Sequence, residues 1–114
     1  MPTDAAALLW DAQAAAHSVC GFVQGRSFAD YLADPMLSAA VERKLEIVGE
    51  ALNQLRKVDA DLAAQIPELS AAVGLRNILI HAYGSVDHRL VWDVATAHLP
   101  ELMGRIERML ADLS

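Results

Sequence analysis

A long apolar stripe between residues 35 and 58 constrains the fold more than any other feature of this sequence. Asp34-Pro35 predicts a helix start, because Asp can cap free N–H groups and proline in the first turn removes only an unpaired N–H. A helix from there to about Val58 would be roughly 35 Å long. Its apolar face must be covered by other elements, which predicts a bundle. That face consists of Leu37, Val41, Leu45, Val48, Leu52 and Leu55.

Gly49 lies in the middle of this predicted helix, where glycine costs about 1 kcal/mol relative to alanine. A close approach by a second helix would compensate for that cost, whereas a merely imperfect helix would leave it uncompensated.

The rest of the sequence also favours helices. Alanine and leucine are its commonest residue types, and no segment alternates strictly between apolar and polar residues. We therefore expect an all-α fold, an up-and-down bundle of about four main helices plus short ones. The other expected helices begin near Asp4 and stop at Gly21 and Gly25, follow a Ser27 cap, span Asp59 to Ile66, span Leu69 to Tyr83, and run from an Asp87 cap to the C-terminus with a kink or restart at Pro100.

Length and charge narrow the function classes. The 114 residues predict a single domain over 1–114. The single cysteine excludes a disulfide framework, and without zinc spacing we expect no metal and no cofactor. The absence of a basic leader and of a ~20-residue apolar run predicts a cytoplasmic protein with no membrane partner. A net charge of −6 argues against broad binding of nucleic acid but leaves room for a small basic site.

The segment Gly74 to Gly84 concentrates chemically active side chains. A helical wheel places Arg76, Asn77, His81 and Tyr83 on one arc with Ile80. Arginine presents a fork of donors that suits phosphate, and histidine transfers protons near neutral pH. Because the 2′-hydroxyl of RNA can itself be the nucleophile, such a pair could cleave RNA without metal. An apolar side chain among polar ones indicates that this face meets another surface, such as a second copy. The opposite arc, expected to face the core, holds Leu75, Ile78, Leu79 and Ala82.

The pattern R-x4-H-x-Y, formed by Arg76, His81 and Tyr83, resembles the HEPN superfamily and specifically its HepT-like ribonuclease toxins. The resemblance extends from about Leu8 to Leu110. It includes the segment 45–51, Ile66-Pro67 before the motif, and the segment 99–102 near the end.

The resemblance implies a HEPN-like bundle that forms a homodimer and brings two motifs into one cleft. It implies metal-independent cleavage of RNA by Arg76 and His81, with Asn77 and Tyr83 in supporting or RNA-binding roles. It also implies a partner, a minimal nucleotidyltransferase antitoxin that adenylylates Tyr83 and silences the toxin. Ile78 stands where many relatives have a second arginine, which weakens the local positive field. The alternative is a non-catalytic binding or regulatory subunit of such a nucleotidyltransferase.

Plainer interpretations stand beside these roles. Arg76 and His81 could belong to a solvated face, with Arg76 paired to Glu50 or Glu46 of the long helix. Glu50 is also a candidate for holding Arg76 in a functional site, and Tyr83 could be a packed ring with a wet hydroxyl. For residues outside the motif, the sequence predicts surface or boundary positions for His17, His88 and His98, a small buried role for Cys20, core or interface anchors at Trp10 and Trp92, and inward positions for Leu90, Val91, Val94 and Ala97.

Overall fold

The computed structural model describes residues 5–113, and these form helices with no strand among them. This confirms the all-α prediction. No helix in this part of the chain is long and apolar enough to cross a membrane. The elements are α1 (Ala5–Val23), α2 (Phe28–Ala33), α3 (Pro35–Val58), α4 (Ala60–Ala63), α5 (Leu69–His81), the 3-10 turn η1 (Tyr83–Ser85), α6 (His88–Asp93), the π-helical turn η2 (Val94–His98) and α7 (Leu99–Leu113).

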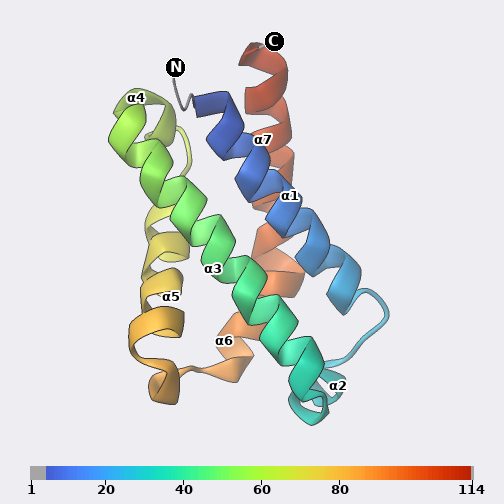
Figure 1. Ribbon diagram of the computed structural model, residues 1–114. Helices are drawn as coiled ribbons and strands as arrows, with labels where there is room; N and C mark the ends of the chain where they lie inside the picture. Colours follow the sequence, from blue (N-terminus) through green and yellow to red (C-terminus); the bar gives the residue numbers. More distant parts are fainter. Residues whose placement is uncertain (1–4, 114) are drawn as a thin grey trace.

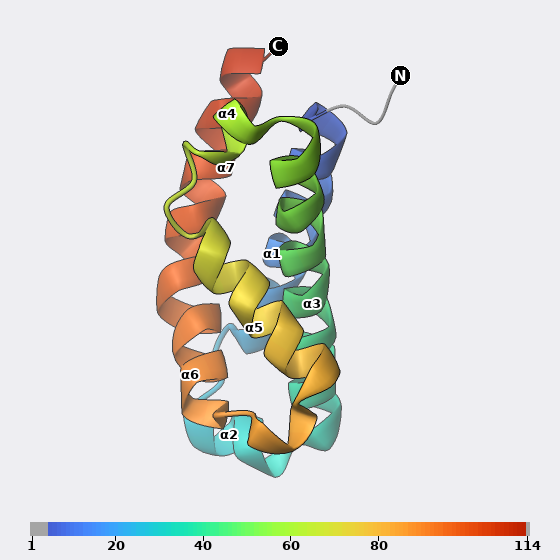
Figure 2. The same cartoon turned by 90° about the vertical axis from the view of Figure 1, so that its left-hand side faces the viewer.

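Helix α3 is the centre of the arrangement. It packs against α1 on one side and α5 on the other, and α1 also packs against α7. Figure 1 shows α3 running diagonally across the molecule, with the end of α7 and the start of α1 near α4 and with α2 and α6 at the opposite end. Turned by 90°, α5 lies across the bundle between α3 and the α6–α7 side (Figure 2). Helix α5, which carries Arg76 and His81, therefore packs against α3, the long helix predicted from the apolar stripe.

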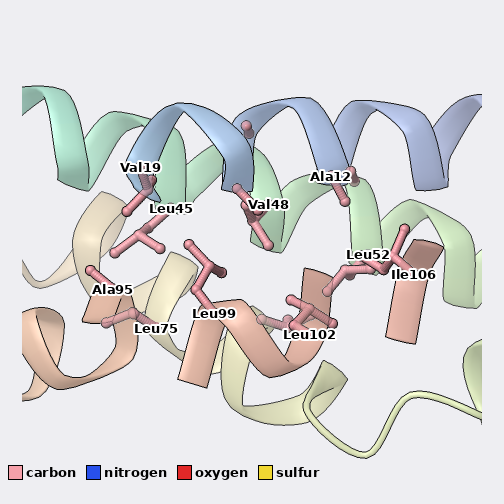
Figure 3. Packing of buried hydrophobic residues seen from close by; sticks show 14 of the residues in the cluster. Ala12, Val19, Leu45, Val48, Leu52, Leu75, Ala95, Leu99, Leu102 and Ile106 are labelled. Carbon is pink, nitrogen blue, oxygen red and sulfur yellow. The ribbon is translucent and has the colours of Figure 1, made fainter. Parts of the chain in front are cut away.

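The core is formed where α1, α3, α5 and α7 face one another. Side chains from all four helices, such as Val19, Val48, Leu75 and Ile106, point into a common interior (Figure 3). Every residue of the predicted α3 stripe is buried. The stripe does what its spacing predicts: it fixes α3 in the middle of the bundle.

The predicted helix starts are confirmed by their hydrogen bonds. Ser27 and Asp30 form a reciprocal capping box at α2. Asp34 accepts from the first N–H groups of α3, Asp59 from α4 and Asp87 from α6. Such caps stabilise a helix by about 1 kcal/mol each. The cap expected at Asp4 lies outside the described residues.

Two predicted details of the helix ends are corrected. Helix α1 continues through Gly21 to Val23, and the chain turns at Gly25, whose φ of +74° suits glycine. The predicted restart at Pro100 is real, but it occurs through η2. The Leu99 N–H donates to the carbonyl of Val94, five residues back, just before the proline that cannot donate.

Some side chains predicted to face inward do not. Leu90 and Ala97 are both exposed. Leu90 lies on the outer side of α6, and at Ala97 the wider π-helical turn changes which side of the helix faces the core. Trp92 is buried as an anchor of the core, whereas Trp10 is exposed on α1. Trp10 is therefore not a core residue.

Candidate active site

Arg76 lies where α5 comes closest to α3. A Cβ atom at Gly49 would overlap the Cβ of Arg76 and would lie 2.7 Å from the carbonyl oxygen of Ala72. Only a glycine fits under this crossing. Of the two alternatives that the sequence left open at Gly49, the structure shows the close approach, and the second helix is the one that carries the motif.

The guanidinium of Arg76 is held by two neighbours. Its Nη2 lies 3.0 Å from Oε1 of Glu50 on α3, and its Nη1 donates to Oδ1 of Asn77 at 2.9 Å. The other oxygen of Glu50 accepts from Gln54, whereas Glu46 pairs with Arg43. The Arg76 side chain is 23% exposed, so the ion pair with Glu50 fixes a cation that solvent still reaches.

The buried face of α5 differs from the predicted arc. Leu75 and Leu79 are buried as expected, but Ile78 is 38% exposed and Ala82 is also exposed. Because Gly49 has no side chain, Arg76 can lie directly against α3. In this orientation of α5, Arg76 faces α3. At about 100° per residue, His81 then projects about 140° away from Arg76.

His81 therefore belongs to an exposed face of α5. Asn77, Ile78 and Gly74 lie on the same face, and a Cβ at Gly74 would meet no described atom within 4 Å. This face combines a proton-transfer group, an amide, an apolar side chain and a flat backbone patch. Such a surface can accept a second helix closely.

Tyr83 is not on the motif helix, which corrects the predicted range of Leu69 to Tyr83. Helix α5 ends at His81, Ala82 leaves the helical region with φ −135°, and Tyr83 begins η1. The predicted alignment of Tyr83 with Arg76 along one helix arc is therefore wrong. Instead, Tyr83 is 60% exposed.

The Glu42 carboxylate changes the chemistry of this tyrosine. The negative charge of Glu42 is the largest cause that raises the pKa of Tyr83 above its ordinary value. Glu42 precedes Glu50 by eight residues, or about 12 Å along α3. The charges that act on Arg76 and on Tyr83 therefore lie at two separate points of α3.

One feature of the sequence indicates that Glu42 lies on the face of α3 that packs against α5. Glu42 and Gly49 are seven residues apart, so they lie on the same face of α3, and Gly49 marks that face as the one under α5. The side chains that surround Glu42 come from other elements of the chain, so the sequence alone does not show them.

An open groove of about 460 Å3 between α1 and α3 extends to Arg76 and Ile80. Both acidic and basic side chains line this groove, so it does not form a uniformly basic path for RNA. The charged residues that line the groove are Asp11, Arg43, Lys44, Glu46, Glu50 and Arg76.

The remaining candidates have the surroundings that suit structural roles. His17 and His98 are exposed, and His88 is exposed beside Glu42. Cys20 is half-buried with its Sγ 3.3 Å from Sδ of Met103, and burial raises the pKa of its thiol, which disfavours a thiolate nucleophile. Residues 5–113 contain no group of three or more His, Cys, Asp or Glu side chains placed to hold a metal ion.

Comparisons with known proteins identify relatives of this chain. The family model "Ribonuclease HepT-like" matches residues 12–109. An inferred RNase of Caldanaerobacter subterraneus subsp. tengcongensis is 38% identical over 88 residues, covering 77% of this chain and 78% of the relative. An inferred RNase of Methanocaldococcus jannaschii is 33% identical over 106 residues, covering 91% and 94%. An inferred ribonuclease HepT of Thermococcus cleftensis is 36% identical over 88 residues, covering 77% and 79%. No solved structure matches the chain.

Proposed function

The chain belongs to the HepT-like ribonuclease family, and from this membership we propose that it is a metal-independent endoribonuclease that uses Arg76 and His81. The observation that carries the proposal is the ion pair of Arg76 with Glu50 over Gly49. It holds a phosphate-binding cation in a fixed place, five residues or about 1.4 helical turns before an exposed histidine.

The two side chains have complementary roles in this reaction. The fork of Arg76 binds the scissile phosphate and stabilises the extra negative charge of the transition state. His81 exchanges protons with the reacting oxygens. The 2′-oxygen forms a bond to phosphorus, the bond to the 5′-oxygen breaks, and the proton lost by the former is balanced by one gained by the latter. The products are a 2′,3′-cyclic phosphate and a 5′-hydroxyl, and Asn77 supports Arg76 through its amide oxygen.

The active form is a homodimer. Within one chain Arg76 turns toward α3 and His81 turns outward, so a second copy is needed to gather more than half a site. The exposed face of α5 around Gly74 and Ile78 supports this pairing, because its flat backbone and apolar side chain allow close helix contact.

The cellular role proposed for this ribonuclease is that of a cytoplasmic toxin controlled by a minimal nucleotidyltransferase antitoxin. Tyr83 is the acceptor of AMP, and its exposed ring at the end of the motif helix supports this role. An adenylyl group there adds bulk and negative charge close to the RNA site.

The direct test is cleavage of synthetic RNAs by the purified protein in excess EDTA, with product ends identified by mass. The wild type should yield cyclic phosphates, and Arg76→Ala and His81→Ala should each lose at least ~100-fold in kcat/KM. His17→Ala is the control, because it removes an exposed histidine of α1. Equal inertness of the wild type and His81→Ala on varied RNAs would defeat the ribonuclease proposal.

A second candidate function is a non-catalytic binding subunit of the nucleotidyltransferase. The observation in its favour is the local charge: Ile78 supplies no second cation, and Glu50 already neutralises Arg76. Expression in a bacterial host separates the two. A toxin should arrest growth and Arg76→Ala should relieve the arrest, whereas a binding subunit should be harmless in both forms.

A further inference from the structure

The open groove between α1 and α3 reaches the candidate cation, but most of its lining takes no part in the proposed cleavage step. Helices α1 and α3 run side by side, and α5 packs on the other side of α3 (Figure 1). The groove passes over α3 from Asp11 on α1 to Arg76 and Ile80 on α5, and its volume is about 460 Å3. Sites for single small molecules measure about 300–1,000 Å3, so the groove has the size for a nucleotide of an unpaired strand and not for a duplex.

The floor of the groove is apolar and belongs to the core. Its buried residues are Leu8, Ala15 and Ala51, each at most 5% exposed. Ile47 packs against the same core, and Ile80 adds an apolar side chain at the α5 end that is 43% exposed. A nucleobase can lay its flat faces against such side chains, whereas a sugar–phosphate backbone gains little from them.

The polar groups on the α1 side of the groove are mainly acceptors. Within residues 5–113, the carboxylate of Asp11 has no ion-pair partner. The hydroxyl of Ser18 donates to the carbonyl of Ala14 at 3.2 Å. The amide nitrogen of Gln54 donates to Glu50 at 3.1 Å. Because both side chains keep an oxygen that can accept a further hydrogen bond, the groove suits a base that presents donors.

Two cations of the groove remain available for phosphates. Arg76 lies at the α5 end, and Lys44 has no ion-pair partner in the part of the chain that the structure describes. By contrast, Arg43 is paired with Glu46 at 3.2 Å. Two cations can contact the phosphates on either side of one nucleotide but cannot follow a long backbone. In a chain of net charge −6, affinity for RNA must therefore come largely from contacts with a base.

We propose that this groove is a base-binding subsite of the ribonuclease, in which an unpaired nucleotide next to the scissile phosphate places its base over α3 toward Asp11. The inference rests on the proposed ribonuclease function and names its substrate class, single-stranded RNA. Cytosine, adenine and guanine carry an exocyclic amino group that donates to the carboxylate, whereas uracil presents carbonyl oxygens. The subsite therefore prefers bases with an amino group over uracil.

The test compares two RNA analogues that cannot be cleaved, 2′-O-methyl hexamers of cytidine and of uridine. The methyl group blocks the nucleophile, so binding is measured without the reaction. Fluorescence anisotropy of labelled hexamers with the full-length protein gives both Kd values at one fixed salt concentration. The wild type should bind the cytidine hexamer ~10-fold more tightly than the uridine hexamer, because the amino group donates to a charged acceptor. Cleavage of the unmodified hexamers in EDTA should show the same preference in kcat/KM.

Asp11→Asn should bring the two Kd values toward equality, because an amide can donate to uracil as well as accept from cytosine. Asp61→Asn is its matched control, since it removes an exposed carboxylate of α4 outside the groove. Ala14→Trp is a second variant. Ala14 is exposed and lines the groove, so the added ring fills the groove without entering the core and should weaken binding of both hexamers ~10-fold or more. Ala64→Trp on α4 is the control for an added tryptophan.

Equal affinity of the wild type for the two hexamers, or binding of neither, would overturn the subsite. A preference that is unchanged in Asp11→Asn would do the same, as would full binding by Ala14→Trp. If the wild type binds with the expected preference but cleaves no RNA, the ribonuclease proposal fails and the groove remains an RNA-binding site. If cleavage is lost in Arg76→Ala but complete in Ala14→Trp, the ribonuclease proposal stands and the subsite fails.

Discussion

Gly49 and Arg76 touch backbone to side chain across the α3–α5 crossing, with no room for a methyl group between them. This relationship links the fold to the site. The missing side chain lets α5 approach α3, and the approach brings the guanidinium of Arg76 to Glu50, the residue directly after Gly49. One glycine thereby determines where the candidate cation is held.

Gly49→Ala should destabilise the protein although alanine is the better helix former. The new methyl group would overlap Arg76 and the carbonyl of Ala72, neither of which can move without shifting α5. Overpacking costs about 1–3 kcal/mol, which exceeds the gain of about 1 kcal/mol in helix propensity. The free energy of unfolding from urea titration measures the difference. Gly21→Ala is the matched control, because a methyl group there meets open space in α1 and stability should stay level or rise.

Arg76→Lys should lose most RNA cleavage while retaining the charge. Lysine can still pair with Glu50, but it lacks the planar fork that binds two phosphate oxygens at once. We expect kcat to fall ~100-fold or more and the unfolding free energy to change little. Arg108→Lys on α7 is the control. Retained activity in Arg76→Lys would mean that Arg76 acts only as a point charge.

Local sequence signals predicted much of the fold correctly. The bounds of α3 follow from Asp34-Pro35 and the apolar stripe, and the caps at Ser27, Asp59 and Asp87 follow from residue type. These helix bounds and caps depend on residues within one or two helical turns, so they can be predicted from the local sequence. At Gly49 the sequence left two alternatives open, a close approach by a second helix or an imperfect helix, and only the structure decides for the first.

The arrangement of the site depends on contacts that the sequence does not display. Polarity alone placed Arg76 on the outer arc, but the distant Glu50 and the gap at Gly49 turn it inward and so move Ile78 outward. Gly84 marks the end of α5 two residues too late, because the helix already ends at His81 and Ala82 leaves the helical region with φ −135°. Arg76 gains its position from partners more than twenty residues away in the sequence.

Gly74→Leu should convert the proposed dimer to a monomer without unfolding the chain. The added side chain has open space within one copy, so the helix content should be unchanged. Against a closely packed second α5 it would clash. Light scattering after size exclusion measures the mass, and Gly21→Leu is the control for an added leucine elsewhere. A dimer that persists in Gly74→Leu would place the interface on another face.

The buried tyrosine predicts a loss of stability at alkaline pH. Burial first, and then the charge of Glu42, raise the pKa of Tyr31 far above its value of 10.0 in the unfolded chain. Between these two values the unfolded chain releases the phenol proton and the folded protein keeps it, so stability is full below pH 10 and falls as pH rises above it. Urea midpoints from pH 8 upward should decline for the wild type. Tyr31→Phe should be less stable at neutral pH by about 1–2 kcal/mol, because Glu42 loses a donor, but its decline above pH 10 should be smaller. Equal slopes would contradict the assignment to Tyr31.

Adenylylation should add mass to this protein at Tyr83 and not at its other tyrosine. The chain has two tyrosines, and Tyr31 is fully buried against Trp92, so only Tyr83 presents a hydroxyl that a nucleotidyltransferase can reach. Co-expression with a minimal nucleotidyltransferase of the proposed partner class should increase the intact mass by one AMP unit or more, with the modified peptide spanning Tyr83. Tyr83→Phe should remove the gain, whereas Tyr31→Phe should keep it, because Tyr31→Phe leaves η1 exposed. A gain that persists in Tyr83→Phe would move the modification to another side chain, and no gain from an active partner would remove Tyr83 as its target.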